Sequence, residues 1–274
     1  MAEISNVGDG DWLNQAWQQD HGQPLCLNRP DILSGLKIIA PACTDSTNQL
    51  LWDLRHQGYQ PPLAAIAREQ TAGRGQWGRS WQSPPGGLYL SLWLATHLPI
   101  SHSPHLVLWS AWGIAYALVQ HGIPVQLKWP NDLLLQGRKL AGIKTESKIS
   151  GGIITAAIVG VGINWINPVP ATGIALGPFC KAQSIQSVTN LTDLAEITLA
   201  GLTLGWHRYQ SEGIGAIVAD YLQLFAHRGR EISLPQGMGI IESITPQGEL
   251  VVVIDQRREI ILPGTISLGY DQGG

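Results

Sequence analysis

The stretch GRGQWGRSWQSPPGG, residues 73–87, decides between two fold classes. Its first three glycines match the G-x-G-x-x-G pattern of dinucleotide-binding folds and follow a predicted strand. In those folds the loop runs directly into a helix whose N-terminus faces the pyrophosphate. Here Pro84 and Pro85, followed by two more glycines, prevent a helix from starting. The stretch therefore predicts an anion-binding loop in a mixed α+β protein, outside the dinucleotide-binding class.

The same loop carries Arg74 and Arg79, whose guanidinium groups provide permanent charge and paired donors for phosphate or carboxylate oxygens. Glycines at alternate positions let backbone amides approach a phosphate closely. Loop amides and arginine side chains are therefore the expected contacts to the anion. A solvent-exposed turn whose arginines only improve solubility is the alternative interpretation of this segment alone.

Composition narrows the class of protein. The 274 residues are 44% hydrophobic and 14% charged, enough for one large core and a small accessory domain. A net charge of −3 argues against a protein whose main work is coating nucleic acid. The three cysteines are widely separated and form no CxxC or Cys/His cluster, which is typical of reduced thiols. With no visible signal peptide or apolar run long enough for a membrane helix, we expect a soluble cytoplasmic protein.

The chain divides into three predicted parts. Residues 1–34 are an acidic extension, too short and with too few basic residues for a DNA-binding domain. Residues 35–226 alternate helical and strand patterns and form the predicted catalytic domain, and residues 227–274 contain short alternating strands typical of a small barrel. The predicted helices span 46–56 and 104–120, with two more between 192 and 225. The predicted strands span 63–68, 88–95, 153–161, 231–234, 239–244, 250–254 and 259–261.

A second constellation, KWPNDLLLQGRKLAG, occupies residues 128–142 within a predicted hairpin from 125 to 146. The hairpin brings Lys128, Asp132 and Lys139 together near one end. Pro130 cannot donate a ladder hydrogen bond, so we expect the strand to break there and Asn131 and Asp132 to leave the sheet. A structural turn in which Asp132 caps backbone amides is the alternative interpretation of the Asn-Asp-Leu triplet alone.

Together these two segments resemble the signatures of biotin protein ligases, in the same order and at the same spacing. Two weaker matches are Asp-Ser-Thr-Asn at 45–48 and Gly-Val-Gly-Ile-Asn at 160–164. The resemblance covers the chain from about residue 40 onward. It implies a mixed-sheet catalytic domain of the biotin/lipoate ligase type with a small C-terminal SH3-like β-barrel, and no partner DNA or membrane.

The implied reaction joins biotin to ATP, releases pyrophosphate, and transfers biotin from biotinyl-5'-AMP to a lysine of the carboxyl carrier domain of acetyl-CoA carboxylase. An anionic carboxylate then has to attack a polyanion, so cations at the site are needed to offset their repulsion. By resemblance, Lys139 contacts both groups, Arg74 closes over the intermediate, Mg²⁺ bridges the phosphates, and Asp132 binds metal or ATP or deprotonates the acceptor lysine. The chain is expected to act as a monomer or homodimer.

The resemblance also divides the site residues between the two substrates. Ser46, Thr47 and Gln70 are implied for the ureido group, although Asp45 and Ser46 are equally good helix caps. The implied biotin-binding set is Ser46, Thr47, Asn48, Gln70, Gly73, Arg74, Gly75, Gln76, Trp129, Lys139, Gly142, Gly160 and Gly162. The implied ATP-binding set is Arg74, Arg79, Trp81, Lys128, Asn131, Asp132, Lys139 and Asn164.

Three residues depart from the family's pattern. Gln76 and Trp77 stand where some members carry further arginines, so the grip on the intermediate depends more on stacking or amide contacts. Lys144 occupies a position where an apolar residue is expected.

Two other functions remain as alternatives. A lipoate or octanoyl transferase shares the general architecture, but the paired signatures and the barrel-like tail favour biotin. The arginine–glycine loop together with eleven tryptophans is also a feature of single-strand nucleic-acid binders, which stack bases on aromatic rings; the net negative charge argues against that class.

Overall fold

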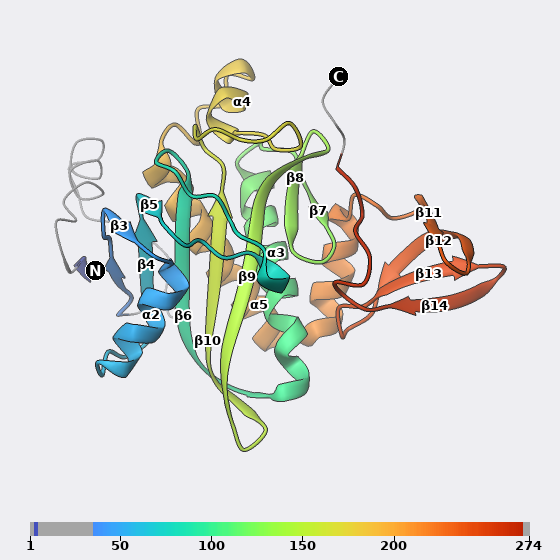
Figure 1. Cartoon of the computed structure of the whole chain (residues 1–274), viewed down its shortest axis with the longest axis horizontal. Coiled ribbons are helices and arrows are strands. Elements are labelled where there is room, and N and C mark those ends of the chain that lie inside the picture. Colours follow the sequence, from blue (N-terminus) through green and yellow to red (C-terminus); the bar gives the residue numbers. More distant parts are fainter. Residues whose placement is uncertain (1–2, 5–34, 271–274) are drawn as a thin grey trace.

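The computed structural model of the chain describes residues 3–4 and 35–270 (Figure 1). Its centre is an eight-stranded mixed sheet in the order β1-β2-β4-β6-β10-β9-β8-β7. The first three strands are parallel, and every later pairing is antiparallel. In chain order the strands are β1 (Glu3–Ile4), β2 (Lys37–Ile39), β4 (Leu63–Ala67), β6 (Leu88–Pro99), β7 (Val125–Lys128), β8 (Asp132–Leu135), β9 (Arg138–Ser150) and β10 (Ile153–Ile163).

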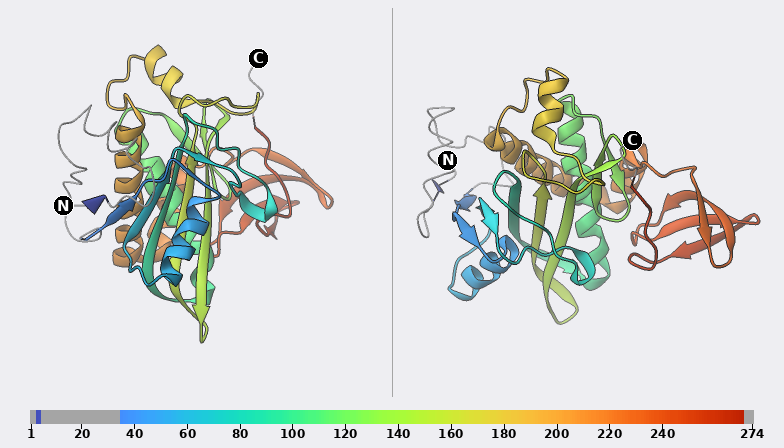
Figure 2. Two further views of the ribbon diagram at one scale, coloured as in Figure 1. Left: turned by 60° about the vertical axis from the view of Figure 1, so that its left-hand side comes forward. Right: turned by 45° about the horizontal axis from the view of Figure 1, so that its top comes forward.

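The helices lie on both faces of this sheet. Figures 1 and 2 show α3 and α5 on one face and the short α2 on the other, with the loop after β5 crossing in front of β9 and β10. The helices are α2 (Thr47–His56), α3 (Ser103–Gln120), α4 (Leu176–Ala182) and α5 (Leu191–Leu224), with short 3-10 helices η1 (Gln76–Gly78) and η2 (Ile100–His102). A two-stranded sheet joins β3 (Cys43–Thr44) to β5 (Glu69–Gln70). Within the described part of the chain, no helix is long and apolar enough to cross a membrane.

Side-chain alternation along the strands creates two separate cores. In β4, Ala64 and Ile66 face the large core under α3 and α5, whereas Leu63 and Ala65 face the small core under α2. Successive side chains of a strand point to opposite faces, so a buried strand has to carry apolar residues at every position. All five residues of β4 are accordingly buried.

Three glycines allow α3 and α5 to cross at backbone contact. A Cβ atom on Gly113 would overlap the carbonyl oxygen of Gly201, and one on Gly205 would overlap the carbonyl oxygen of Trp109. A Cβ on Gly201 would lie 2.8 Å from the Cα of Ile114. Because backbone atoms are on both sides of each contact, no side-chain movement relieves an added methyl group.

The C-terminal part forms a second sheet, antiparallel in the order β11-β12-β13-β14. Its strands are β11 (Glu231–Leu234), β12 (Gly237–Ile244), β13 (Leu250–Ile254) and β14 (Arg257–Ile261). Its buried residues belong to the same core as α3 and α5, and the indole of Trp129 donates a hydrogen bond to the carbonyl of Gly248 at 2.7 Å. Closure of this sheet into an SH3-like barrel, and a domain boundary at residue 227, stay predictions.

The predicted α+β class with a mixed sheet is confirmed, and the predicted strands and helices overlap observed ones, with ends that coincide or differ by one to four residues. The predicted hairpin from 125 to 146 consists of three strands, β7, β8 and β9. The two helices expected near 192–225 form α5, which is interrupted at Gly213, whose φ is 77°. The expectation that Asp132 leaves the sheet is wrong: Asp132 begins β8 and pairs with Lys128 and Gly142. The predicted extension, 1–34, lies outside the described residues except for the short β1.

We expect Gly113→Ala to lower the free energy of unfolding by about 1–3 kcal/mol, because the added methyl group forces the two helices apart. The matched control is Gly215→Ala, a helical glycine of α5 where a Cβ meets nothing within 4 Å. That substitution should raise stability by up to about 1 kcal/mol through helix propensity. Urea denaturation measures both, and equal effects of the two substitutions would contradict the backbone-contact explanation.

Candidate active site

The candidate site lies on the sheet face that carries α2. In the neighbouring strands β6, β10, β9 and β8, the residues on this face around the site include Ser91, Gly160, Gly162, Gly142 and Asp132, whereas the residues beside them in these strands belong to the core under α3 and α5. Three of these five residues are glycines. The middle of the face therefore has no side chains of its own and leaves a recess.

A pocket lies over this recess, and most of the predicted site residues line it. From the predicted sets, those lining the pocket are Ser46, Thr47, Asn48, Gln70, Arg74, Gly75, Gln76, Arg79, Trp81, Lys128, Trp129, Asn131, Asp132, Lys139, Gly142, Gly160 and Gly162. These residues come from the start of α2, the loop at 73–83, the five strands β5, β7, β8, β9 and β10, and the turn between β7 and β8. The pocket thus unites the two sequence signatures, which lie more than 40 residues apart.

One end of the pocket is polar and uncharged. The Thr47 amide and hydroxyl donate to Gln70 Oε1 at 2.9 and 3.2 Å. The buried Ser91 hydroxyl lies 2.6 Å from both Thr47 Oγ1 and Asn48 Oδ1, and Gln70 Nε2 donates to Ser83 Oγ at 2.7 Å. This network fixes the orientation of several amide and hydroxyl groups before any ligand binds.

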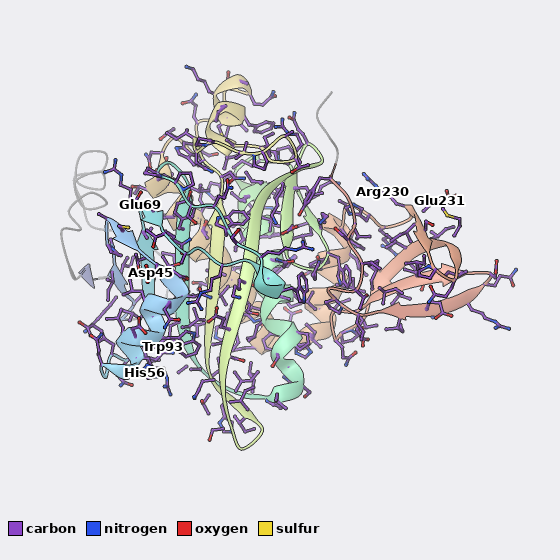
Figure 3. All side chains as sticks on the ribbon, viewed as in Figure 1. Asp45, His56, Glu69, Trp93, Arg230 and Glu231 are labelled. Atoms are coloured by element: carbon purple, nitrogen blue, oxygen red, sulfur yellow. The ribbon has the colours of Figure 1, made fainter. Side chains whose placement is uncertain are left out.

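Helix capping does not explain the polar residues at the start of α2. Ser46 is the N-cap residue but its side chain makes no capping hydrogen bond. Asp45, labelled in Figure 3, accepts a hydrogen bond from the Thr71 hydroxyl at 2.8 Å. Asn48 Nδ2 is buried and has no hydrogen-bond partner among the described residues. A buried donor without a partner is costly, so its presence at the pocket wall favours a ligand acceptor there.

The other end of the pocket is charged. Asp132 Oδ1 lies 2.8 Å from Lys139 Nζ, and Oδ2 lies 3.4 Å from Lys128 Nζ. Burial lowers the pKa of Lys128, the nearby charge of Asp132 opposes that shift, and Lys139 and Arg79 add to it. The side chain of Lys139 is 27% exposed, against 6% for Lys128. Lys139 is therefore the lysine of the pair that is open to an incoming anion.

Trp81 covers the glycine recess. A Cβ on Gly142 would lie 3.0 Å from the Trp81 ring, and one on Gly162 would overlap the indole. Lys139 Nζ is 5.2 Å from the centre of this ring, within the range of a cation–π interaction. The indole Nε1 is buried without a partner among the described residues. The indole N–H of Trp81 is thus available to donate a hydrogen bond to a ligand.

The arginine–glycine loop is a small hairpin closed by its own backbone. The amides of Gly75 and Trp81 donate to the carbonyls of Arg79 and Gly73 at 2.6 and 2.8 Å, and the turn places Trp77 and Gly78 in the left-handed region. The amides of Gly75, Arg79 and Trp81 are used within the loop and are not free for an anion in this conformation. The loop instead contributes side chains, and Arg74 is held on α2 by Gln49 at 2.9 Å.

Two reciprocal contacts fasten the loop to β9. Lys144 Nζ donates to the Gly75 carbonyl at 3.1 Å, and Gln76 Nε2 donates to the Ile143 carbonyl at 3.3 Å. Two of the three residues that depart from the family's pattern, Gln76 and Lys144, therefore meet at this seam. Lys144 was not among the predicted site residues, although its position two residues after Gly142 on the same strand places it on the pocket face.

Two predicted residues do not line the pocket. The carbonyl of Gly73 pairs with Trp81, and a Cβ at Gly73 would clash with the Trp81 backbone, so its role is to close the hairpin. The side-chain Nδ2 of Asn164 donates to the Lys139 carbonyl at 3.3 Å, and the backbone amide of Asn164 donates to the Leu140 carbonyl. Asn164 thus supports the backbone that carries Lys139.

The segment after β14 forms a wall that sequence reasoning missed. Gly264, Ile266, Ser267, Leu268 and Tyr270 all line the pocket. Nothing in the local sequence marks these residues, because they reach the site only through the way the C-terminal sheet packs on the larger one.

Comparisons with known proteins identify the family to which the chain is similar. Residues 40–164 match the model of the biotin/lipoate A/B protein ligase family. A biotin--[acetyl-CoA-carboxylase] ligase of Paracoccus denitrificans is 31% identical over 242 residues, 83% of this chain and 99% of that protein. The bifunctional ligase/repressor BirA of Bacillus spizizenii is 32% identical over 151 residues, which cover 52% of this chain and 46%, about half, of that protein.

A solved structure of a biotin protein ligase has a similar fold. The structure of a biotin protein ligase from Aquifex aeolicus, in complex with biotin and ATP, superimposes with a TM-score of 0.68 at 24% identity and covers 85% of this chain and 99% of that one. The alignment covers nearly the whole length of the Paracoccus protein, and both sequence signatures line one pocket. The chain belongs to the biotin/lipoate A/B protein ligase family, among the biotin protein ligases.

Proposed function

We propose that the chain joins biotin to ATP, forming biotinyl-5'-AMP and pyrophosphate, and then transfers biotin to a lysine of a carboxyl carrier domain in the cytoplasm. The observation that carries the proposal is the polarity of the pocket. Uncharged donors and acceptors lie at one end, and a cluster of two lysines and one carboxylate lies at the other. Biotin has the same polarity, with a neutral ureido ring at one end and a carboxylate at the other.

The uncharged end supports binding of the ureido ring. That ring offers two N–H donors and one carbonyl acceptor, and the pocket offers hydroxyl and amide groups of both kinds from Thr47, Asn48 and Gln70. The glycines at 160 and 162 let a ring lie directly against the sheet. Trp129, which is almost fully buried, contributes apolar surface.

The charged end supports the first chemical step. The carboxylate oxygen of biotin attacks the α-phosphorus of ATP, a bond from oxygen to phosphorus forms, and pyrophosphate leaves. The partly exposed Lys139, which lies 2.8 Å from Asp132, would contact both anions, and Arg79 adds positive charge near Lys128. Fixed positive charge in a buried site lowers the repulsion between the two anions more than it would in water.

Mg²⁺ enters this scheme with the nucleotide as part of the substrate. The described residues contain no group of three or more His, Cys, Asp or Glu side chains that could hold a metal ion, and Asp132 is the acidic residue that lines the pocket. Magnesium commonly binds through one or two carboxylates together with substrate phosphates. Asp132 would therefore be the protein's contribution, in exchange for one of its lysine contacts.

The loop shields the reactive anhydride from water. The pocket encloses about 140 Å³, less than the roughly 300–1,000 Å³ of sites that hold drug-sized ligands. Trp81 occupies the recess where the biotin ring would lie. Entry of substrate therefore requires Trp81 and its loop to move, and closure afterwards excludes water until the carrier lysine arrives.

We expect the purified chain to exchange labelled pyrophosphate into ATP when biotin is present, because adenylation is reversible before transfer. Lipoate supplied in place of biotin is the matched substrate control. Exchange driven by lipoate, and absent with biotin, would assign the chain to the lipoate branch of the family.

Lys139→Met should abolish this exchange, lowering the rate by a factor of 100 or more, since a charge contact to the reacting groups is lost. Lys181→Met, on the exposed surface of α4, is the control and should leave the rate unchanged. Both proteins should still unfold cooperatively. Normal turnover in Lys139→Met would remove this lysine from the mechanism.

Asp132→Asn should lower the pKa of Lys128 further, because the carboxylate opposes the downward shift that burial causes. Lys128 would then lose its proton at a lower pH than in the unmodified chain. NMR titration of the lysine side-chain signals measures the change. Glu242→Gln removes a carboxylate from the C-terminal sheet and should leave the Lys128 titration as it was; an unchanged pKa in Asp132→Asn would show that the ion pair is not formed.

A further inference from the structure

The tail after β14 returns from the C-terminal sheet to the charged end of the pocket. Leu268 is buried within the large core, and Ile266 packs against that core. Gly264 lies under the indole of Trp77, so the tail also touches the arginine–glycine loop. In Figure 1 this segment runs upward beside β7 and β8. Residues 264–268 are therefore anchored, and they hold the next aromatic residue at a defined place.

That residue, Tyr270, contacts all three members of the charged cluster. Its hydroxyl donates a hydrogen bond to Asp132 Oδ2. Lys128 Nζ lies 4.0 Å from the centre of its ring, and Lys139 Nζ lies 5.8 Å from it. Both distances fall within the range of cation–π attraction.

These contacts assign different partners to the two oxygens of one carboxylate. Oδ2 receives the tyrosine hydroxyl and the more distant Lys128, while Oδ1 faces Lys139 at 2.8 Å. A carboxylate that accepts a hydrogen bond on one oxygen cannot rotate without breaking it. The hydroxyl therefore fixes the plane of Asp132, and with it the direction in which Lys139 is held.

We propose that Tyr270 is a positioning residue for adenylation, which orients Asp132 through its hydroxyl and covers Lys128 with its ring. This inference rests on the proposed function for its kinetic part. Tyr270 acts through the carboxylate and the two lysines, and it belongs to the end of the pocket where the biotin carboxylate and the phosphate would meet. The polar end at α2 is formed by other residues and should be unaffected by changes in the tail.

Two substitutions separate the roles of the hydroxyl and the ring. Tyr270→Phe removes the hydrogen bond and keeps the ring over Lys128, whereas Tyr270→Leu removes both. We expect Tyr270→Phe to lower kcat for biotin-dependent exchange roughly 10- to 100-fold, the effect of one hydrogen bond to a charged group. The KM for biotin should change less than about twofold, since uniform binding at the α2 end is retained. Tyr116→Phe, on the exposed side of α3, is the control and should keep full activity.

The Asp132→Asn background tests whether the effect passes through Asp132. In that background, Tyr270→Phe should lower kcat little further, because the effects of two residues that act on the same group are not additive. Full turnover in Tyr270→Phe, or losses that multiply in the double variant, would overturn the proposal. Melting curves confirm that each variant is folded.

A second readout does not depend on the reaction. Acylation of Lys128 by a small amine reagent, followed by mass spectrometry, should be faster in Tyr270→Leu and unchanged in Tyr270→Phe. Equal rates in all three proteins would refute the shielding by the ring. Absence of biotin-dependent exchange in the unmodified chain would refute the proposed function, and the acylation rates would still decide whether the Tyr270 ring covers Lys128.

Discussion

The central sheet has to bury large side chains on one face and leave room for a ligand on the other. Because successive side chains of a strand point to opposite faces, one strand can place large residues in the core and small residues at the site. In β10, Val159 and Val161 pack under α3 and α5, while Gly160 and Gly162 open the opposite face. The recess thus depends on the same strand pairing as the core, and a shift of register by one residue would fill the pocket and open the core.

The charged end of the site is built on the same constraint. Lys128 and Asp132 are directly opposite each other at the end of the β7–β8 pair, so their contact follows from register. Burying two ammonium groups is costly unless a carboxylate is within reach. Asp132 offsets that cost in the structure, and in the proposed reaction substrate anions would take its place. Because the lysine side chains are already in position, anion binding would not require the site to rearrange them.

Loop and tail are additions to this framework. The loop contributes arginines and Trp81, and hydrogen bonds from Gln76 and Lys144 hold it against β9. The tail contributes Tyr270. Together they cover the pocket from two sides, and their contact at Trp77 and Gly264 joins them. The active site is therefore completed by segments nearly 190 residues apart in the chain.

Local patterns in the sequence predicted most of the elements and the α+β class, because hydrophobic periodicity and turn residues act over short distances. The residues expected to line the pocket came chiefly from the resemblance to biotin protein ligases. The signatures at 73–87 and 128–142 predicted the lysines, the arginines and Asp132. Only the tertiary structure decided that Asp132 stays in its strand, that the loop uses its amides internally, that Asn164 supports Lys139 from outside, and that Tyr270 reaches the site. Each of these depends on packing between distant segments, which no local pattern encodes.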